Sequence, residues 1–248
     1  MELLEPRLTP SAVSPDAAYI QALYAKLLDR PAGQSDFAYW LPILNGPAGR
    51  AGVVAGIAES LEARTYVVGE WYQQYLERPV VGTEAQAWID ALTTLPEVDV
   101  LAGILSSPEY LADPGGEYGG EVILHDYYAV LNRSPFPNDF GGVVYWNAVL
   151  DAQAHAYYAA THSQDYGPVV FQVQRLFLST TEYRSDVIAG YYTEYLGHVP
   201  DQASLNYWLA SKLDQASIRS LIFASDEFAG RALTGSLPAP VTSLSYTP

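Results

Sequence analysis

The chain has 248 residues and carries 12 Lys and Arg against 28 Asp and Glu, a formal net charge of −16 at pH 7. A field of this sign repels nucleic-acid phosphates and anionic lipid, so neither is an expected partner. The absence of Cys excludes disulfides, thiol catalysis and Cys-based metal sites. No apolar run reaches the roughly 18 residues that a membrane-spanning helix needs, so no span is expected.

In the N-terminal third of the chain, the sequence pattern predicts an extended arm followed by helices. Residues 1–16 contain repeated Pro with Ser and Thr, which predicts an extended arm, and they lack the basic and apolar stretch of a signal peptide. An apolar stripe with helical spacing then predicts a first helix that Pro31 stops. A second helix capped by Ser35 or Asp36, and a third over about residues 50–60, are expected to follow.

One pattern returns four times along the chain: a Tyr, a Leu four residues later, a basic residue two further on, and then a Trp. The Trp follows the basic residue after ten positions in three copies and after thirteen in the third. This recurrence predicts an all-α protein of four degenerate repeats, each of about three helices. The recurring residues are Tyr24, Leu28, Arg30 and Trp40; Tyr72, Leu76, Arg78 and Trp88; Tyr127, Leu131, Arg133 and Trp146; and Tyr192, Leu196, His198 and Trp208.

A second motif closes each copy with a Glu that follows a Ser or Thr by two positions. In copies two and three, Ser106 and Ser179 stand three residues before this Glu, which is the spacing of a capping box. The closing motif is therefore expected to begin the next helix. The four closing acids are Glu62, Glu109, Glu182 and Glu227.

The repeats are expected to form two halves. The Pro- and Gly-rich segment 113–120 predicts a linker between repeats one and two, over residues 17–112, and repeats three and four, over residues 121–235. The long gap before the third closing motif places an insertion at 151–166, expected as a loop for partner contact. Residues 236–248 predict a second extended arm.

These landmarks resemble a bacterial domain-of-unknown-function family that is related to the phycobilisome linker domain. Its members read approximately Tyr-x-x-Leu-Leu-Gly-Arg-x-Pro, then an acidic turn, a Tyr-Trp pair and Ser-Pro-Glu-Tyr. Residues 24–31, the pair Tyr39-Trp40 and residues 107–110 carry the likeness, which extends over about residues 17–230. The resemblance implies an all-helical interaction module, common in large secreted and cell-surface proteins, and implies no catalytic residues. The chain departs from the family pattern where Asp29, Glu77 and Asn132 replace the usual Gly, which Gly197 keeps.

The recurring aromatic and basic residues have a structural interpretation and a binding interpretation. A Trp that returns once per repeat is expected to anchor the core, because burying an aromatic side chain contributes on the order of 4–6 kcal/mol gross; a ligand platform is the alternative. The basic residues are expected to tie their loops by pairing with the closing acids or with helix C-terminal carbonyls, and anion binding is the alternative. Trp71 lies outside the repeat register.

Other candidate chemistry is sparse. The neighbouring His125 and Asp126 point in different directions on a helix, so they do not predict a catalytic dyad. His155 and His162 are too far apart to chelate one ion alone, and the acidic segment 138–142 lacks the ligand pattern of a calcium loop. No catalytic residue, metal ligand or cofactor is therefore expected, although calcium binding is left open. The residues expected to form a possible contact surface are Trp71, Tyr157, Tyr158 and His162.

The sequence favours a non-enzymatic, extracellular structural or assembly protein that makes protein–protein contacts. Its expected partners are other copies of itself, in a surface layer or filament, or other surface proteins. The alternative is a carbohydrate-binding surface module that uses exposed Tyr and Trp side chains. A linker role with pigment proteins is disfavoured, because the phycobilisome linkers are usually basic and this chain is strongly acidic.

Overall fold

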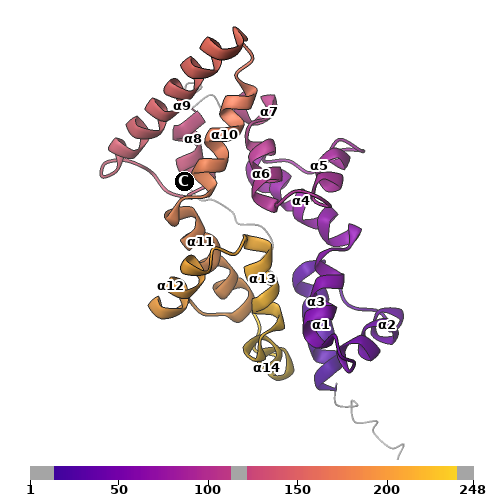
Figure 1. The fold of residues 1–248 in the computed structure, drawn as a ribbon. Helices are drawn as coiled ribbons and strands as arrows, with labels where there is room; N and C mark the ends of the chain where they lie inside the picture. The colour runs from indigo at the N-terminus through magenta and orange to yellow at the C-terminus, as the bar shows by residue number, and fades with distance from the viewer. Residues whose placement is uncertain (1–13, 113–121, 239–248) are drawn as a thin grey trace, which may run out of the picture.

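The structure is a computed structural model that describes residues 14–112 and 122–238. Its described residues contain helices, turns and loops and no strand, which confirms the all-α prediction (Figure 1). The predicted linker and most of both predicted arms lie outside the described residues. The first helices are α1 (Pro15–Leu27), α2 (Gln34–Leu44), α3 (Gly49–Ala58), α4 (Leu61–Tyr75), α5 (Gln86–Ala91), α6 (Glu97–Leu105) and α7 (Pro108–Ala112). Then follow α8 (Val122–Ala129), α9 (Phe140–Thr161), α10 (Gly167–Leu178), α11 (Thr181–Tyr191), the π-helix η1 (Tyr192–Leu196), α12 (Gln202–Ser211), α13 (Gln215–Ala224) and α14 (Asp226–Thr234).

The start of α2 differs from the sequence prediction. Its N-cap is Gly33, and neither Ser35 nor Asp36 occupies that position. Asp36 lies in the first turn of the helix, where its Oδ2 accepts a hydrogen bond from the Gly33 backbone N–H at 2.8 Å. The carboxylate thus satisfies a donor that the helix start leaves unpaired, and it does so from inside the helix.

Each closing motif begins a helix, as expected, but the cap lies one residue later than the capping-box spacing suggests. Ser107 and Thr180, and not Ser106 and Ser179, accept the backbone N–H three residues ahead, at 3.3 Å in both cases. Ser60 and Ser225 do the same at 3.1 Å. The closing Glu therefore stands at the second helical position, so its carboxylate is free to point away from the cap.

The insertion at 151–166 is mostly helix, where a loop was expected. Residues 151–161 continue α9, which runs without a break for 22 residues, and only residues 162–166 leave the helix. None of the residues 151–161 is buried. Figure 1 shows α9 as the long helix at the edge of the molecule, extending well past its neighbours α8 and α10.

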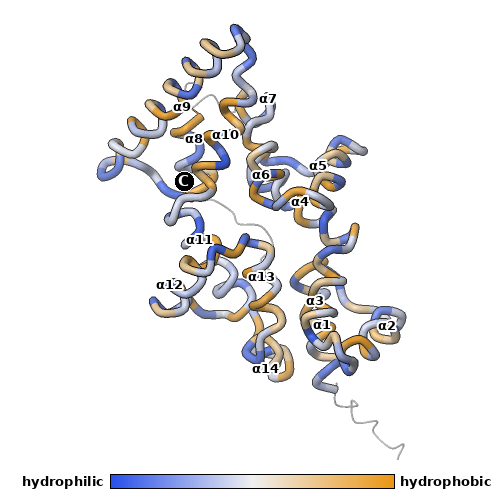
Figure 2. Tube along the Cα trace, in the orientation of Figure 1, coloured by the Kyte–Doolittle hydropathy of each residue, from blue (hydrophilic) through white to orange (hydrophobic). Residues whose placement is uncertain are grey.

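The hydrophobic core joins segments that are distant in sequence. One buried cluster combines α1 and α3 with α13 and α14, and a second combines α6 with α8 and α10. The Tyr19 hydroxyl in α1 donates to the Phe223 carbonyl in α13 at 3.0 Å, which fixes the N-terminal helices against the C-terminal ones. Hydrophobic and hydrophilic residues alternate along the helices (Figure 2), as amphipathic packing requires. Both of these clusters draw on both sides of the 113–120 segment, whereas a third, formed by residues of α4, α5 and α6, lies within the predicted first half.

Candidate functional site

Four similar polar clusters hold the loops that follow the recurring Tyr-Leu motif. In the first, Arg30 binds Glu62 through two nitrogens, with Nη2 donating to Oε2 at 2.9 Å, and Nη1 donates to Asp36 Oδ2 at 3.0 Å. The guanidinium also lies over the Tyr24 ring, 4.7 Å from its centroid. Paired hydrogen bonds of this kind fix geometry as well as adding energy. Arg30 therefore links the loop after α1 to Asp36 in the first turn of α2 and to the closing acid Glu62 at the start of α4.

The second and third clusters repeat this arrangement. Arg78 binds Glu109 and Glu84, and Arg133 binds Glu182 and Asp139. Arg78 and Arg133 lie over Tyr72 and Tyr127 at 5.3 and 4.8 Å. In the fourth cluster His198 Nε2 lies 2.7 Å from Glu227 Oε1. The basic residues thus meet the closing acids that the sequence paired with them, and no anion site is needed to explain their presence.

The acid six residues after each Arg is the part of the cluster that sequence reasoning missed. The arginine partner lowers the pKa of the Glu62 and Glu109 carboxyls, and a hydrogen bond from the Gly33 N–H lowers that of Asp36. The Arg side chains are about one-third exposed, so each pair contributes modestly to stability. The recurring six-residue spacing was the sequence signal that could have identified Asp36, Glu84 and Asp139.

The residue before each recurring basic residue has a left-handed backbone conformation. Asp29, Glu77 and Asn132 have φ values of 49°, 53° and 48°, and Gly197 has 76°. These are the positions where the family pattern has Gly. A non-glycine side chain in this region is strained by roughly 1–2 kcal/mol. The departure from Gly is thus accommodated by strain and not by a different turn.

The four recurring Trp side chains pack against the hydrophobic clusters, and Trp40 is buried. Trp40 Nε1 donates to the Tyr24 hydroxyl at 2.8 Å, and Trp208 Nε1 donates to the Tyr192 hydroxyl at 3.0 Å. The edge of the Trp88 ring packs against Gly103, where an added Cβ would lie 2.6 Å from the ring. This is the setting of a core anchor, and it leaves little free ring face for a ligand.

Exposed tyrosines accompany three of these Trp residues. Tyr39, Tyr145 and Tyr207 directly precede the Trp of their copy and are 63%, 61% and 65% exposed. Each ring meets the following Trp edge to face, at 4.7 to 5.5 Å between centroids. The repeat therefore presents an oriented aromatic side chain to solvent, a feature typical of contact surfaces.

Exposed apolar side chains also lie along α9, and we call the group Phe140, Val144 and Tyr158 the α9 surface. These side chains are 45–54% exposed. Phe140 and Tyr158 are 18 residues apart, five helical turns, so they lie on the same face. Only one of the 22 residues of α9, Asp151, is charged. Exposed apolar patches of this kind mark interaction sites.

The predicted contact residues fall in two places. Tyr157, Tyr158 and His162 lie at the C-terminal end of α9, where the Tyr158 and His162 rings meet edge to face at 5.8 Å. Trp71 instead lies on α4, where it is half-buried and lines a cavity that opens to solvent. Within the described residues no group of three or more His, Cys, Asp or Glu side chains could hold a metal ion.

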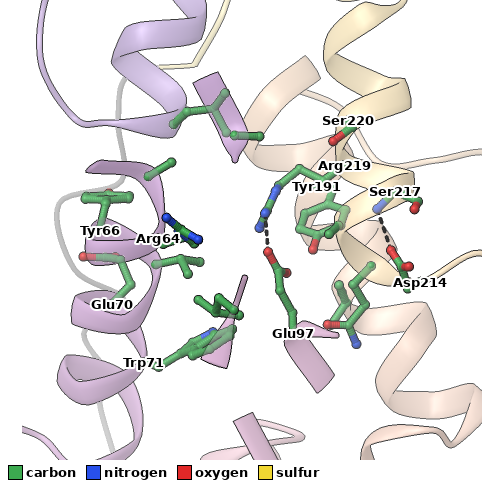
Figure 3. A pocket seen from close by; sticks show the side chains of 18 of the residues that line it. Arg64, Tyr66, Glu70, Trp71, Glu97, Tyr191, Asp214, Ser217, Arg219 and Ser220 are labelled. Carbon is green, nitrogen blue, oxygen red and sulfur yellow. Dashed lines mark hydrogen bonds and ion pairs between the residues drawn. The ribbon is translucent and has the colours of Figure 1, made fainter. Parts of the chain in front are cut away.

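This cavity opens to solvent, has a volume of about 1000 Å³ and lies between α4 on one side and α11 and α13 on the other (Figure 3). Arg64, Tyr66, Glu70 and Trp71 form the α4 wall, and Arg219 on the opposite wall is paired with Glu97. Aromatic and charged side chains therefore face the same space from helices that are far apart in the sequence.

Lys26 is a buried cation at this cavity, with 7% of its surface exposed. Its Nζ has no hydrogen-bond partner among the described residues, and neither do the Nε atoms of Arg64 and Arg219. Burial lowers the pKa of Lys26 and raises that of Glu194 near it. Unpartnered buried donors are rare in folded proteins. Their gathering at one cavity makes it the strongest ligand-site candidate in the described chain.

Asp126 forms a separate, sealed polar network in the core. Its carboxylate is fully buried and accepts from the Tyr110 hydroxyl at 2.8 Å and from Gln174 Nε2 at 3.0 and 3.1 Å. Burial raises the pKa of Asp126 to about 7. The His125 ring stacks on Tyr110 with 4.6 Å between centroids. Asp126 cannot reach a substrate, so this raised pKa reflects core structure.

The fold and the site residues define an all-α protein with recurring arginine–carboxylate clusters. Residues 11–67 match the model of a family described as a domain of unknown function (DUF4214), which supports the domain-of-unknown-function resemblance for this part of the chain. No curated protein and no solved structure matches the chain. Across the described residues, no helix combines the length and apolar character that crossing a membrane requires.

Proposed function

We propose that this protein is a non-enzymatic, extracellular assembly module whose first partner is a second copy of itself, bound through the α9 surface. The observation that carries this proposal is the exposed, almost uncharged α9. A 22-residue helix with one charged residue is unusual on a chain of net charge −16. Two strongly acidic chains repel each other over most of their surfaces, so they can meet most easily where charge is absent.

The composition of α9 suits packing against an identical helix. Its second half is rich in alanine, which allows close approach of two helix backbones, and Tyr158 supplies a large amphipathic side chain near its end. Two copies related by a two-fold axis would bury the same surface on both partners. A surface layer or filament needs a second contact, which we assign to the predicted arms 1–16 and 236–248.

Charge insertion on the α9 surface tests this proposal. Tyr158→Glu places a carboxylate at the contact twice in a symmetric dimer, and we expect the self-association constant to fall at least tenfold. The matched control is Tyr207→Glu, because Tyr207 is also an exposed helical tyrosine but lies on α12. Sedimentation velocity at several protein concentrations measures both. Equal association of wild type and Tyr158→Glu rejects the α9 contact.

A carbohydrate-binding surface module is the second candidate, favoured by the exposed Tyr39, Tyr145 and Tyr207. Aromatic side chains held at fixed positions suit sugar stacking as well as protein contact. A triple Tyr→Ser variant at these positions should abolish glycan capture if this function holds. The double variant Tyr39→Ser/Tyr207→Ser, which leaves α9 intact, should weaken glycan capture and leave capture of a second copy unchanged if α9 carries the assembly. The two functions are thus separable with one set of proteins.

A further inference from the structure

We propose that the cavity between α4, α11 and α13 binds a neutral oligosaccharide, independently of assembly through α9. The first reason is the set of unpartnered donors. Lys26, Arg64 and Arg219 line the cavity, and their buried Nζ, Nε and Nε atoms lack hydrogen-bond partners among the described residues. Each of these groups can only donate, so a ligand that pairs with them supplies acceptor oxygens.

The charge of the lining excludes most acceptor-rich ligands. Three basic and six acidic side chains line the cavity. A carboxylate or phosphate ligand would meet Lys26, but it would be repelled by the surplus of acids. A polyamine would suit the acids, but it has no acceptors for the three unpartnered nitrogens. The ligand must therefore carry acceptors without net negative charge.

Hydroxyl groups meet this requirement because each is both a donor and an acceptor. They can accept from Arg64 and donate to the Glu70 carboxylate, which lies on the same α4 wall (Figure 3). Trp71 and Tyr66 add aromatic surface for the apolar face of a sugar ring. The volume of about 1000 Å³ is at the upper end of the usual ligand-pocket range of roughly 300–1000 Å³. A ligand of roughly two or three sugar rings fits such a volume.

Lys26 also supplies a readout that separates a ligand-binding role from a structural one. A buried ammonium without a hydrogen-bond partner destabilises the fold, so Lys26→Met should raise the melting temperature. The same change removes a donor to the ligand and should weaken binding about tenfold or more. If Lys26 were a structural residue, Lys26→Met would lower the melting temperature instead.

The experiment is titration calorimetry of the full chain with millimolar neutral trisaccharides built from glucose, mannose, xylose and N-acetylglucosamine. Trigalacturonate and spermidine serve as anionic and cationic probes. We expect saturable binding of at least one neutral trisaccharide and none of the charged probes. Binding of a charged probe alone, or of no probe, overturns the proposal.

Variants assign the binding to the cavity. Arg64→Met and Lys26→Met should each weaken binding at least tenfold, whereas Tyr39→Ser, outside the cavity, should leave it unchanged. If either of the first two variants fails to fold, Trp71→Phe replaces it, because this change keeps an aromatic ring in place. Trp71→Phe should weaken binding and remove the ligand-induced change in tryptophan fluorescence. Loss of binding in Tyr39→Ser, with full binding in the cavity variants, would place the sugar on the outer surface and overturn the cavity site.

Discussion

Replacing the buried Asp126 with asparagine should make the stability of the protein less dependent on pH. The side chain is 0% exposed, and burial raises its pKa from 3.8 to about 7. The folded state therefore holds a proton that the unfolded chain releases above about pH 4. As pH rises from 4 to 7, the unfolded state binds fewer protons than the folded state, so wild-type stability decreases. Above pH 7 the contribution of this group is constant.

The size of the effect follows from the shift. About three pKa units at 1.36 kcal/mol per unit correspond to a loss of up to about 4 kcal/mol between pH 4 and pH 7. The asparagine side chain of the variant cannot ionise, so it avoids this loss. Its amide can also donate to Gln174 Oε1, a buried acceptor that has no partner among the described residues. We expect Asp126→Asn to equal wild type near pH 4 and to exceed it by up to about 4 kcal/mol at pH 8.

Urea unfolding of both proteins at single pH steps from 4 to 8, followed by far-UV circular dichroism, measures this difference. The difference between the two free energies of unfolding removes the contributions of all other titrating groups, including the acids paired with arginine. We expect the difference to grow with pH up to about 7 and then to level off. A difference that stays constant from pH 4 to 8 would show that Asp126 has an ordinary pKa and would refute this reasoning.

Four further substitutions, at three positions, test the recurring features of the repeat, each by urea unfolding at pH 7. Arg78→Ala should destabilise the protein by about 1 kcal/mol, because it removes two carboxylate contacts at a partly exposed site, and Arg78→Lys should recover only part of this; no change in either variant would show that the cluster has no structural effect. Glu77→Gly should stabilise the protein by about 0.5–1 kcal/mol by relieving a left-handed backbone at φ 53°, and a loss of stability would contradict the strain. Gly103→Ala should destabilise by about 1–3 kcal/mol and change tryptophan fluorescence, because the added Cβ would lie 2.6 Å from the Trp88 ring; wild-type stability and emission would rule out this close contact.

The sequence predicted local structure well because local signals determine it. Helical periodicity and the Pro and Gly breaks gave the all-α class, and the Ser and Thr of the closing motifs gave the helix starts to within one residue. The sequence also predicts the Arg30–Glu62 contact, because the closing Glu recurs in all four copies and the basic residue recurs as Arg in three and as His198 in the fourth. That the chain comprises four repeats stays our interpretation of these recurrences.

Long-range packing was not accessible in the same way. Nothing local indicates that α1 packs against α14, or that Gln174 reaches Asp126 across 48 positions. The cavity depends on this packing, since Lys26, Arg64 and Arg219 meet only when α1, α4 and α13 come together. The break in the repeat predicts a loop at 151–166, whereas the alanines of this segment continue the helix that precedes it.

Assembly through α9 is the central claim, and the mass of the protein in solution tests it most directly. Light scattering after size exclusion, with and without millimolar calcium, measures that mass over a range of concentrations. The account predicts at least a dimer of the 27.1 kDa chain for wild type, and the Tyr158→Glu variant at 27.1 kDa. A wild-type protein that stays at 27.1 kDa at every concentration, in both conditions, would contradict it.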